Sequence, residues 1–196
     1  NVTFIMTKKE KTEATAKELF WKHGFKKVSI DEICKKAAVS RKTFYTYYPN
    51  KQALVLSILE SLTNEMLDVF AVLVADTEKS FSEKMNMLLL LKFEMNKEFS
   101  MEFINDFLHP DSAELLEYLN TVVGKSLKLT REFFTNAQQN GEMNPGLNLD
   151  FLLWNMQKQL EICSTPEALA MFPDSESMVR QISELMIFGV MKPEQR

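Results

Sequence analysis

The chain has 196 residues and a formal net charge of −4, with 45% hydrophobic residues but only five Gly and six Pro. It is long enough to bury a sizeable core, and because its apolar residues recur every three or four positions, we predict an all-helical protein. It has no apolar run of the roughly 18 residues that span a membrane, and no signal-peptide start. Its two cysteines lie too far apart to suggest a disulfide framework. We therefore expect a cytoplasmic protein.

The charges are divided unevenly along the chain. Residues 1–51 hold twelve Lys and Arg against five Asp and Glu, whereas residues 52–196 hold eleven against twenty-two. This asymmetry indicates a small cationic module that meets a polyanion, carried on an acidic body. We therefore predict two domains, residues 1–52 and residues 53–196. Charge alone fits a solvated basic surface without a partner equally well.

The cationic segment predicts three short helices. The first covers residues 8–23, and Gly24 is the kind of residue that ends a helix. Ser29, with a glutamate three residues later, forms a capping box that starts the second helix. Ser40 can cap a third helix over residues 41–48, which a proline then ends.

The acidic body reads as further helices separated by short breaks. We expect helices over residues 51–75, 81–99, 101–109, 112–140, 149–163 and 176–191. The clearest loop is GEMNPG at residues 141–146. The sequence shows no internal repeat and no low-complexity segment.

Two short helices joined by a tight turn, the second of them basic, are typical of a helix-turn-helix. With about 100° between successive residues of a helix, Phe44 and Tyr48 share one face and can pack inward. Lys42 and Thr46 then point the opposite way, and Tyr47 lies at the edge. The sequence therefore predicts a three-helix DNA-binding domain whose third helix enters the major groove.

Hydroxyl and cationic side chains make up the candidate DNA-binding residues. They are Ser29, Arg41, Lys42, Thr43, Tyr45, Thr46, Tyr47 and Lys51. Lys42 can donate to guanine, and the methyl groups of Thr43 and Thr46 can contact thymine. The tyrosines at the edge, the arginine and Lys51 suit phosphate oxygens. The alternative is that the tyrosines are only core residues, which we accept for Tyr48.

The stretch SIDEICKKAAVSRKTFYTYYPNKQAL resembles the DNA-binding segment of TetR-type (TetR/AcrR) transcriptional regulators. The matching positions are Thr43, Tyr45, Tyr47, Tyr48, Asn50, Lys51 and Leu54. The resemblance covers about residues 8–56. The chain departs from the family pattern at two positions, with Ala38 where the turn usually carries Gly and Lys42 where Gly or Pro is common.

The resemblance implies a larger helical domain that dimerises through its last two long helices and binds a small, largely apolar effector. The residues expected at the dimer interface are Met178, Ile182, Leu185, Met186 and Gly189. The residues expected around the effector are Met66, Phe70, Phe93, Phe103, Phe107, Trp154 and Met156. In each case the alternative is ordinary packing inside one chain.

The sequence does not indicate catalysis. Its only histidines, His23 and His109, have no partner at metal-ligand spacing, and no nucleophile motif or phosphate loop is present. We expect no enzyme activity, no metal and no cofactor. We expect a repressor that binds a palindromic operator in double-stranded DNA as a homodimer and is released by its effector. The alternatives are a protein of the same fold that acts architecturally or through a protein partner, and an interaction protein that has lost DNA binding.

Overall fold

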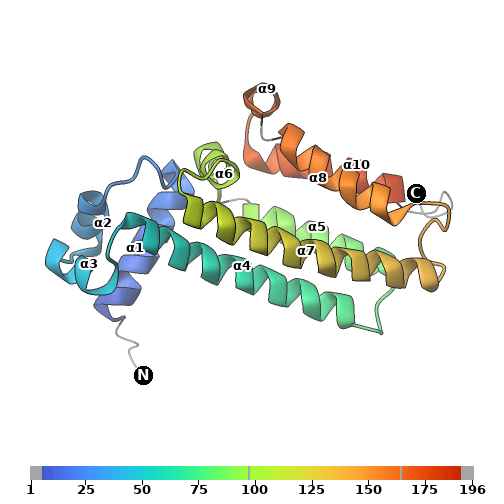
Figure 1. Ribbon diagram of the computed structural model, residues 1–196, viewed down its shortest axis with the longest axis horizontal. Helices are drawn as coiled ribbons and strands as arrows, with labels where there is room; N and C mark the ends of the chain where they lie inside the picture. The colour runs from blue at the N-terminus through green and yellow to red at the C-terminus, as the bar shows by residue number, and fades with distance from the viewer. Residues whose placement is uncertain (1–5, 97, 164, 191–196) are drawn as a thin grey trace. The chain divides into compact units, whose positions relative to one another are not determined.

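The computed structural model describes residues 6–96, 98–163 and 165–190, and the regular structure in this part of the chain is helical (Figure 1). The helices are α1 (Lys8–His23), α2 (Ile30–Ala37), α3 (Arg41–Tyr47), α4 (Lys51–Ala75), α5 (Phe81–Asn96), α6 (Met101–Leu108), α7 (Ala113–Gln139), α8 (Leu149–Cys163), α9 (Pro166–Leu169) and α10 (Ser175–Val190). The predicted all-helical class is confirmed. None of the helices in the described residues is long and apolar enough to cross a membrane.

The chain forms two compact units. The first unit holds Asn1–Thr63 and Glu98–Glu117, and the second holds Asn64–Lys97 and Tyr118–Arg196. Helix α6 therefore belongs to the same unit as the three N-terminal helices, although about forty residues of sequence separate it from the end of the first segment. The domain boundary expected between residues 52 and 53 stays a prediction.

The helix ends depart from the expected ranges at a few places. Helix α3 ends at Tyr47, one residue early, because Tyr48 before the proline is extended, with φ −133° and ψ 121°. Helix α5 ends at Asn96 and not at residue 99. The short helix α9 was not expected, and the Thr165 hydroxyl caps it by accepting the Ala168 N–H at 3.2 Å.

The first three helices share one small core. Phe20 of α1, Ile33 of α2 and Phe44 of α3 are each at most 1% exposed. Helix α1 packs against α2 and α3, which also pack against each other (Figure 1). The hydrophobic faces of three short helices are thus buried together, which stabilises helices that would be marginal alone.

Helix α6 holds the loop that joins α1 to α2. The buried carboxylate of Asp106 accepts the backbone N–H of Lys26 through Oδ2 at 2.8 Å, and its Oδ1 lies 3.9 Å from the Lys26 ammonium nitrogen. The Ser100 N–H donates to the Trp21 carbonyl at 2.8 Å. Gly24 in this loop has φ +75° and ψ 153°, a conformation essentially confined to glycine.

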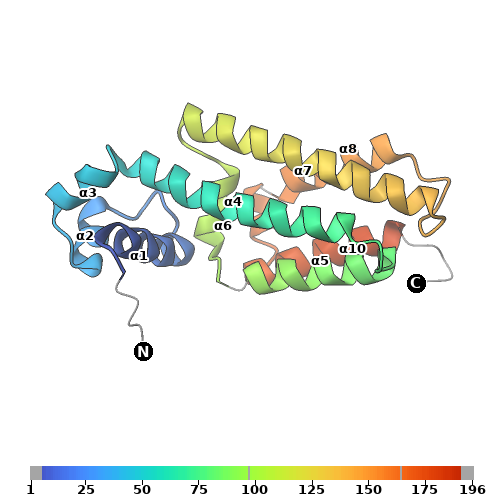
Figure 2. The ribbon, with the colours of Figure 1, turned by 90° about the horizontal axis from the view of Figure 1, so that it is seen from below.

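The second unit has its own apolar core. It consists of Val74, Phe81, Met85, Phe133, Phe134, Ala137, Met143, Leu152 and Leu153, with Phe70, Leu88, Leu127, Leu147, Leu149 and Met156 packed against it. Helix α10 packs along α5, and the two lie side by side in Figure 2. We call the core residues named above, together with those packed against them, the body cluster.

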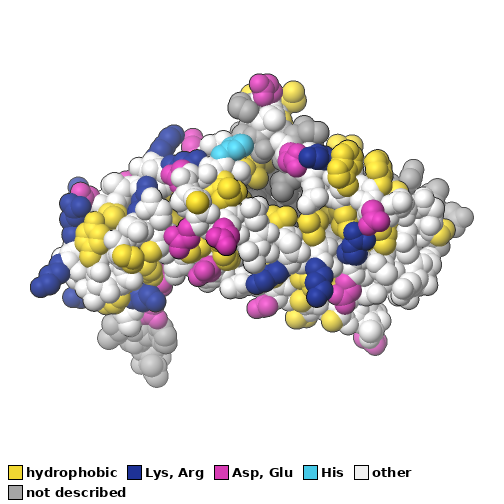
Figure 3. Space-filling view, in the orientation of Figure 1, with side chains coloured by type: hydrophobic (Ala, Val, Ile, Leu, Met, Phe, Trp, Pro, Cys, Tyr) yellow, Lys and Arg dark blue, Asp and Glu magenta, His cyan; other side chains and the backbone are white. Residues whose placement is uncertain are grey.

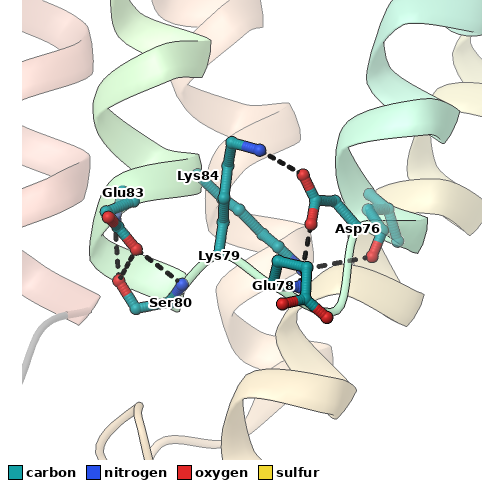
Figure 4. Close-up of polar contacts among 7 residues, drawn as sticks. Asp76, Glu78, Lys79, Ser80, Glu83 and Lys84 are labelled. Carbon is teal, nitrogen blue, oxygen red and sulfur yellow. Dashed lines mark hydrogen bonds and ion pairs between the residues drawn. The ribbon is translucent and has the colours of Figure 1, made fainter.

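Polar contacts fix the turn between α4 and α5. The Lys79 ammonium pairs with the Asp76 carboxylate, and Ser80 and Glu83 cap each other's backbone N–H groups at the start of α5 (Figure 4). The Phe81 N–H donates to the Glu142 carboxylate at 2.8 Å, so the loop after α7 also caps α5.

Replacing Ala38 by Gly should stabilise the protein. Ala38 ends α2 with φ 52° and ψ 44°, the only positive φ of a non-glycine residue among the described residues. An alanine in the left-handed conformation costs about 1–2 kcal/mol, which the change to glycine relieves. Part of this gain is lost, because glycine is more flexible than alanine in the unfolded chain and so loses more entropy on folding. We expect Ala38→Gly to raise the free energy of unfolding by about 0.5–1 kcal/mol in urea titrations. The matched control Ala37→Gly, inside the helix, should lower it.

Replacing Gly24 by Ala should destabilise the protein. A Cβ on Gly24 would lie 2.5 Å from the Asp106 Oδ2 atom, and the backbone conformation there is strained for any other residue. We expect a loss of about 2–4 kcal/mol in the same titration. Gly124→Ala is the control, because a Cβ there meets no atom within 4 Å and alanine favours the α7 helix. Equal stability of the two variants would contradict the role given to the Gly24 loop.

Candidate nucleic-acid interface

Local capping sets where α3 begins. The Ser40 hydroxyl oxygen accepts the Thr43 backbone N–H at 3.0 Å and lies 2.9 Å from the Thr43 hydroxyl oxygen. Ser29 caps α2 in the same way, accepting the Glu32 N–H at 3.2 Å. Both caps satisfy amides that have no partner inside their helices. Ser29 and Thr43 therefore have structural contacts of their own in this domain.

Helix α3 has one buried side and one exposed side. Phe44 is fully buried and Tyr48 is 5% exposed, whereas Tyr45 is 47% and Tyr47 is 38% exposed. Lys42 and Thr46 are exposed as well. The two tyrosines in the exposed set thus present large apolar rings with hydroxyl groups to the solvent. Such rings are more common at binding surfaces than on an inert one.

Tyr48 is held as part of the core. Its hydroxyl donates to the Glu13 carboxylate of α1. Burial raises the pKa of Tyr48 well above its ordinary value, and the hydrogen bond to Glu13 raises this pKa further. The side chain stays neutral and fixes the end of α3 against α1.

Arg41 is oriented by two neighbours. Its Nε lies 3.2 Å from the Asp31 carboxylate of α2. The pKa of Arg41 is raised first by a hydrogen bond with the Tyr45 side chain and then by the charge of Asp31. The guanidinium has five N–H donors, so several remain beside the one that faces Asp31.

The Thr46 hydroxyl is used inside the helix. It donates to the Lys42 carbonyl at 2.9 Å, so its methyl group is the part left to contact a ligand. The Lys42 ammonium is exposed and makes no contact with a neighbouring side chain in the described part of the chain. Lys and Arg side chains gather over α1, α2 and α3 (Figure 3).

Lys51 has a different environment from the other candidate cations. Its ammonium donates to the carbonyls of Lys26 and Val28, at 2.9 and 3.1 Å, in the loop between α1 and α2. It is partly buried, and two of its three N–H groups are taken. No sequence pattern indicates this contact, because both carbonyls belong to backbone more than twenty residues earlier.

The residues expected around an effector do not lie in one place. Phe103 is 3% exposed and packs on Trp21 of the first unit, with Phe107 beside it. Phe70 and Met156 belong to the body cluster of the second unit. The side chain of Phe93 lies outside the described residues.

Two of the expected effector residues are on the surface. Trp154 is 53% exposed and stacks on Phe151, itself 58% exposed, with ring centroids 6.0 Å apart. Met66 is 40% exposed. The residues of α8 that pack in the body cluster include Leu152, Leu153 and Met156 but not Trp154, whose place at an effector stays a prediction.

The residues expected at a dimer interface also divide. Met178 is 5% exposed in the single chain, and its place at an interface stays a prediction. Ile182 is half-buried, and Leu185 is 74% exposed. Met186 and Gly189 lie outside the residues whose burial the structure describes. Figure 3 shows further hydrophobic side chains exposed over α8.

Comparisons with known proteins match the helix-turn-helix most strongly. The family model for bacterial regulatory proteins of the tetR family matches residues 14–58. The transcriptional regulator EthR of Mycobacterium tuberculosis is 36% identical over 69 residues, which cover 34% of this chain and 32% of EthR. The chain spans less than half the length of the first curated relatives that it matches.

The whole fold also has solved counterparts. Regulatory protein TetR from Rhodobacter sphaeroides superposes with a TM-score of 0.74 at 16% identity, over 93% of this chain and 98% of that one. FadR from Bacillus subtilis, solved in complex with stearoyl-CoA, gives 0.66 at 17% identity, over 91% and 97%. The capped helix α3, with buried Phe44 and exposed Tyr45 and Tyr47, lies inside residues 14–58, the segment that matches the model for bacterial regulatory proteins of the tetR family.

Proposed function

We propose that the chain is a repressor that binds a palindromic operator in double-stranded DNA as a homodimer, in the cytoplasm. The exposed side of α3 carries this proposal, because it gathers Lys42, Tyr45, Thr46 and Tyr47 on a helix whose other side is buried. The width of an α-helix suits the major groove. We take residues 1–52 as the DNA-binding domain and residues 53–196 as the effector-binding and dimerisation domain.

The exposed groups divide between bases and phosphates. Lys42 has donors that match the guanine O6 and N7 acceptors, and the Thr46 methyl can contact thymine. Tyr45, Tyr47 and Arg41 have hydroxyl or guanidinium donors suited to phosphate oxygens, which set the register of the protein on DNA. Ser29 caps α2, and the Thr43 N–H donates to the Ser40 cap of α3, so both residues stand beside these groups with structural contacts of their own.

Lys51 is proposed as a positioning residue. Its two hydrogen bonds to the α1–α2 loop hold the start of α4 against the DNA-binding helices. One N–H of the ammonium remains for a phosphate. This assignment shifts the main role of Lys51 from contacting DNA, as expected from its position in the sequence, to holding the domain together.

The dimer is proposed to form through α8 and α10. Leu185 of α10 and the stacked pair of Phe151 and Trp154 on α8 are large apolar side chains left in solvent by the single chain. Aromatic residues are enriched in protein interfaces, and two-fold symmetry matches the two half-sites of a palindrome.

A small, largely apolar effector is proposed to bind the second unit and release the DNA. Support comes from the Phe and Met side chains at the edge of the body cluster, such as Phe70 and Met156, and from FadR, whose structure holds stearoyl-CoA. The effector must bind the DNA-incompetent state more tightly, and DNA must then weaken effector binding by the same factor. The alternative is a regulator of the same fold that acts architecturally or through a protein partner.

Lys42→Ala should relax base preference without lowering stability. The best duplex is first selected from a random pool, and fluorescence anisotropy then compares it with single-base variants. We expect the variant to lose about 5–150-fold of the discrimination at one position in each half-site. Lys128→Ala, at an exposed lysine of α7, is the control and should keep it. Affinity for the wild-type duplex should fall steeply with salt, and a single half-site should bind much more weakly.

If neither the salt dependence nor the Lys42 effect is seen, the DNA-binding surface has been assigned wrongly. If half-site and full-site duplexes bind equally, the dimeric mode on a palindrome is wrong, while DNA binding through α3 stands.

Lys51→Met should lower stability, in contrast to Lys42→Ala. Methionine keeps most of the apolar stem but leaves the carbonyls of Lys26 and Val28 without their donor. We expect a loss of about 1–3 kcal/mol in urea unfolding. DNA affinity should fall similarly for all sequences, because the recognition helix is less well held. Unchanged stability with weaker DNA binding would show that Lys51 acts on phosphate alone.

A further inference from the structure

Gln159 of α8 has a buried side-chain oxygen without a hydrogen-bond partner among the described residues. Its Oε1 is inaccessible to solvent and has no hydrogen-bond partner among the described residues. It is the only side-chain atom in this part of the chain with that property. Natural proteins keep few such groups, because each one left unpaired costs about 1–3 kcal/mol. An unpaired buried oxygen on an apolar face of a helix therefore needs a physical explanation.

The position of Gln159 beside the body cluster suggests the cause of this unpaired oxygen. Leu152 and Met156 lie seven and three residues before it, so all three share the inward face of α8. Among the residues whose burial the structure describes, the body cluster includes Leu152, Leu153 and Met156 of α8. Gln159 lies about one turn beyond Met156 on the same face. A molecule bound beside Met156 would therefore meet this amide.

We propose that Gln159 anchors the effector, accepting a hydrogen bond from a hydroxyl or N–H group on an otherwise apolar molecule. This inference rests on the effector binding proposed above and narrows the class of compound. The core residues nearest along α8 are hydrophobic, so the body of the ligand must be apolar. The amide oxygen can only accept, so the ligand must carry a donor. An effector with acceptors alone, such as an ether, leaves the oxygen unpaired.

The free protein supplies the first measurement. Gln159→Leu removes the orphan oxygen at similar volume, and we expect its melting temperature to rise by about 2–4 °C at fixed protein concentration. Gln139→Leu, at an exposed glutamine at the end of α7, is the matched control and should change it little. A lower melting temperature for Gln159→Leu would mean that the amide has a favourable partner, and would overturn the inference. Gln159→Met replaces the leucine variant if that variant does not fold.

Matched probes supply the second measurement. The four compounds are 1-dodecanol and 1-methoxydodecane, and 4-phenylphenol and 4-methoxybiphenyl, so that each donor is paired with an ether of similar shape. We expect at least one alcohol or phenol to bind the full-length protein about fivefold more tightly than its ether by titration calorimetry, the ratio given by one ordinary hydrogen bond. Gln159→Leu should bind both members of that pair equally, and Gln139→Leu should keep the preference.

The remaining outcomes each count against the anchor. Equal binding of both members by the wild type, a preference that survives in Gln159→Leu, or no binding of any of the four compounds overturns it. Failure of the operator experiment would instead overturn DNA binding and leave both Gln159 measurements readable. Conversely, a protein that binds its operator but fails these tests remains a DNA-binding regulator without this anchor.

Discussion

The first unit depends on the loop between α1 and α2, which is held from two sides. On one side the buried Asp106 carboxylate of α6 accepts the Lys26 N–H and faces the Lys26 ammonium. Separating this loop from α6 would cost free energy, because it would leave the buried Asp106 carboxylate without its partners. On the other side the Lys51 ammonium binds two carbonyls of the loop. Gly24 makes the arrangement possible, because any side chain there would meet the carboxylate.

The exposed side of α3 is a consequence of how firmly its other side is held. Phe44 is fully buried, and Tyr48 is tied to α1 through Glu13, so rotation of the helix would expose aromatic surface and break a buried hydrogen bond. The strained Ala38 ends α2 in the left-handed conformation and lets α3 start at once. The protein thus accepts a local strain of about 1–2 kcal/mol to keep the turn tight. Rigid presentation of a few side chains is what a groove-reading helix needs.

Sequence reasoning succeeded where the determining contact is local. The caps at Ser29 and Ser40 and the inward pair on α3 follow from spacings of three and four residues. It did not predict the hydrogen bonds of Lys51, because their acceptors lie in a distant loop. It also did not predict that Trp154 is exposed and Met178 buried in the single chain, for a different reason. A protein with both a core and an interface has two apolar faces on the same helices, and periodicity shows which residues share a face but not which face is inside.

The charges around α3 explain how an exposed ion pair can coexist with DNA binding. Asp31 holds Arg41 in the free protein, but both side chains are more than half exposed, and such a pair contributes at most about 1 kcal/mol. In the proposed complex a DNA phosphate would therefore replace Asp31 as the partner of Arg41 at little cost. Residues 52–196 carry a net negative charge, which would repel the same phosphates and so favour the proposed docking through the basic segment. Asp31 thus orients the Arg41 guanidinium in the free protein without binding it tightly. The negative charge of residues 52–196 would at the same time limit where DNA can bind.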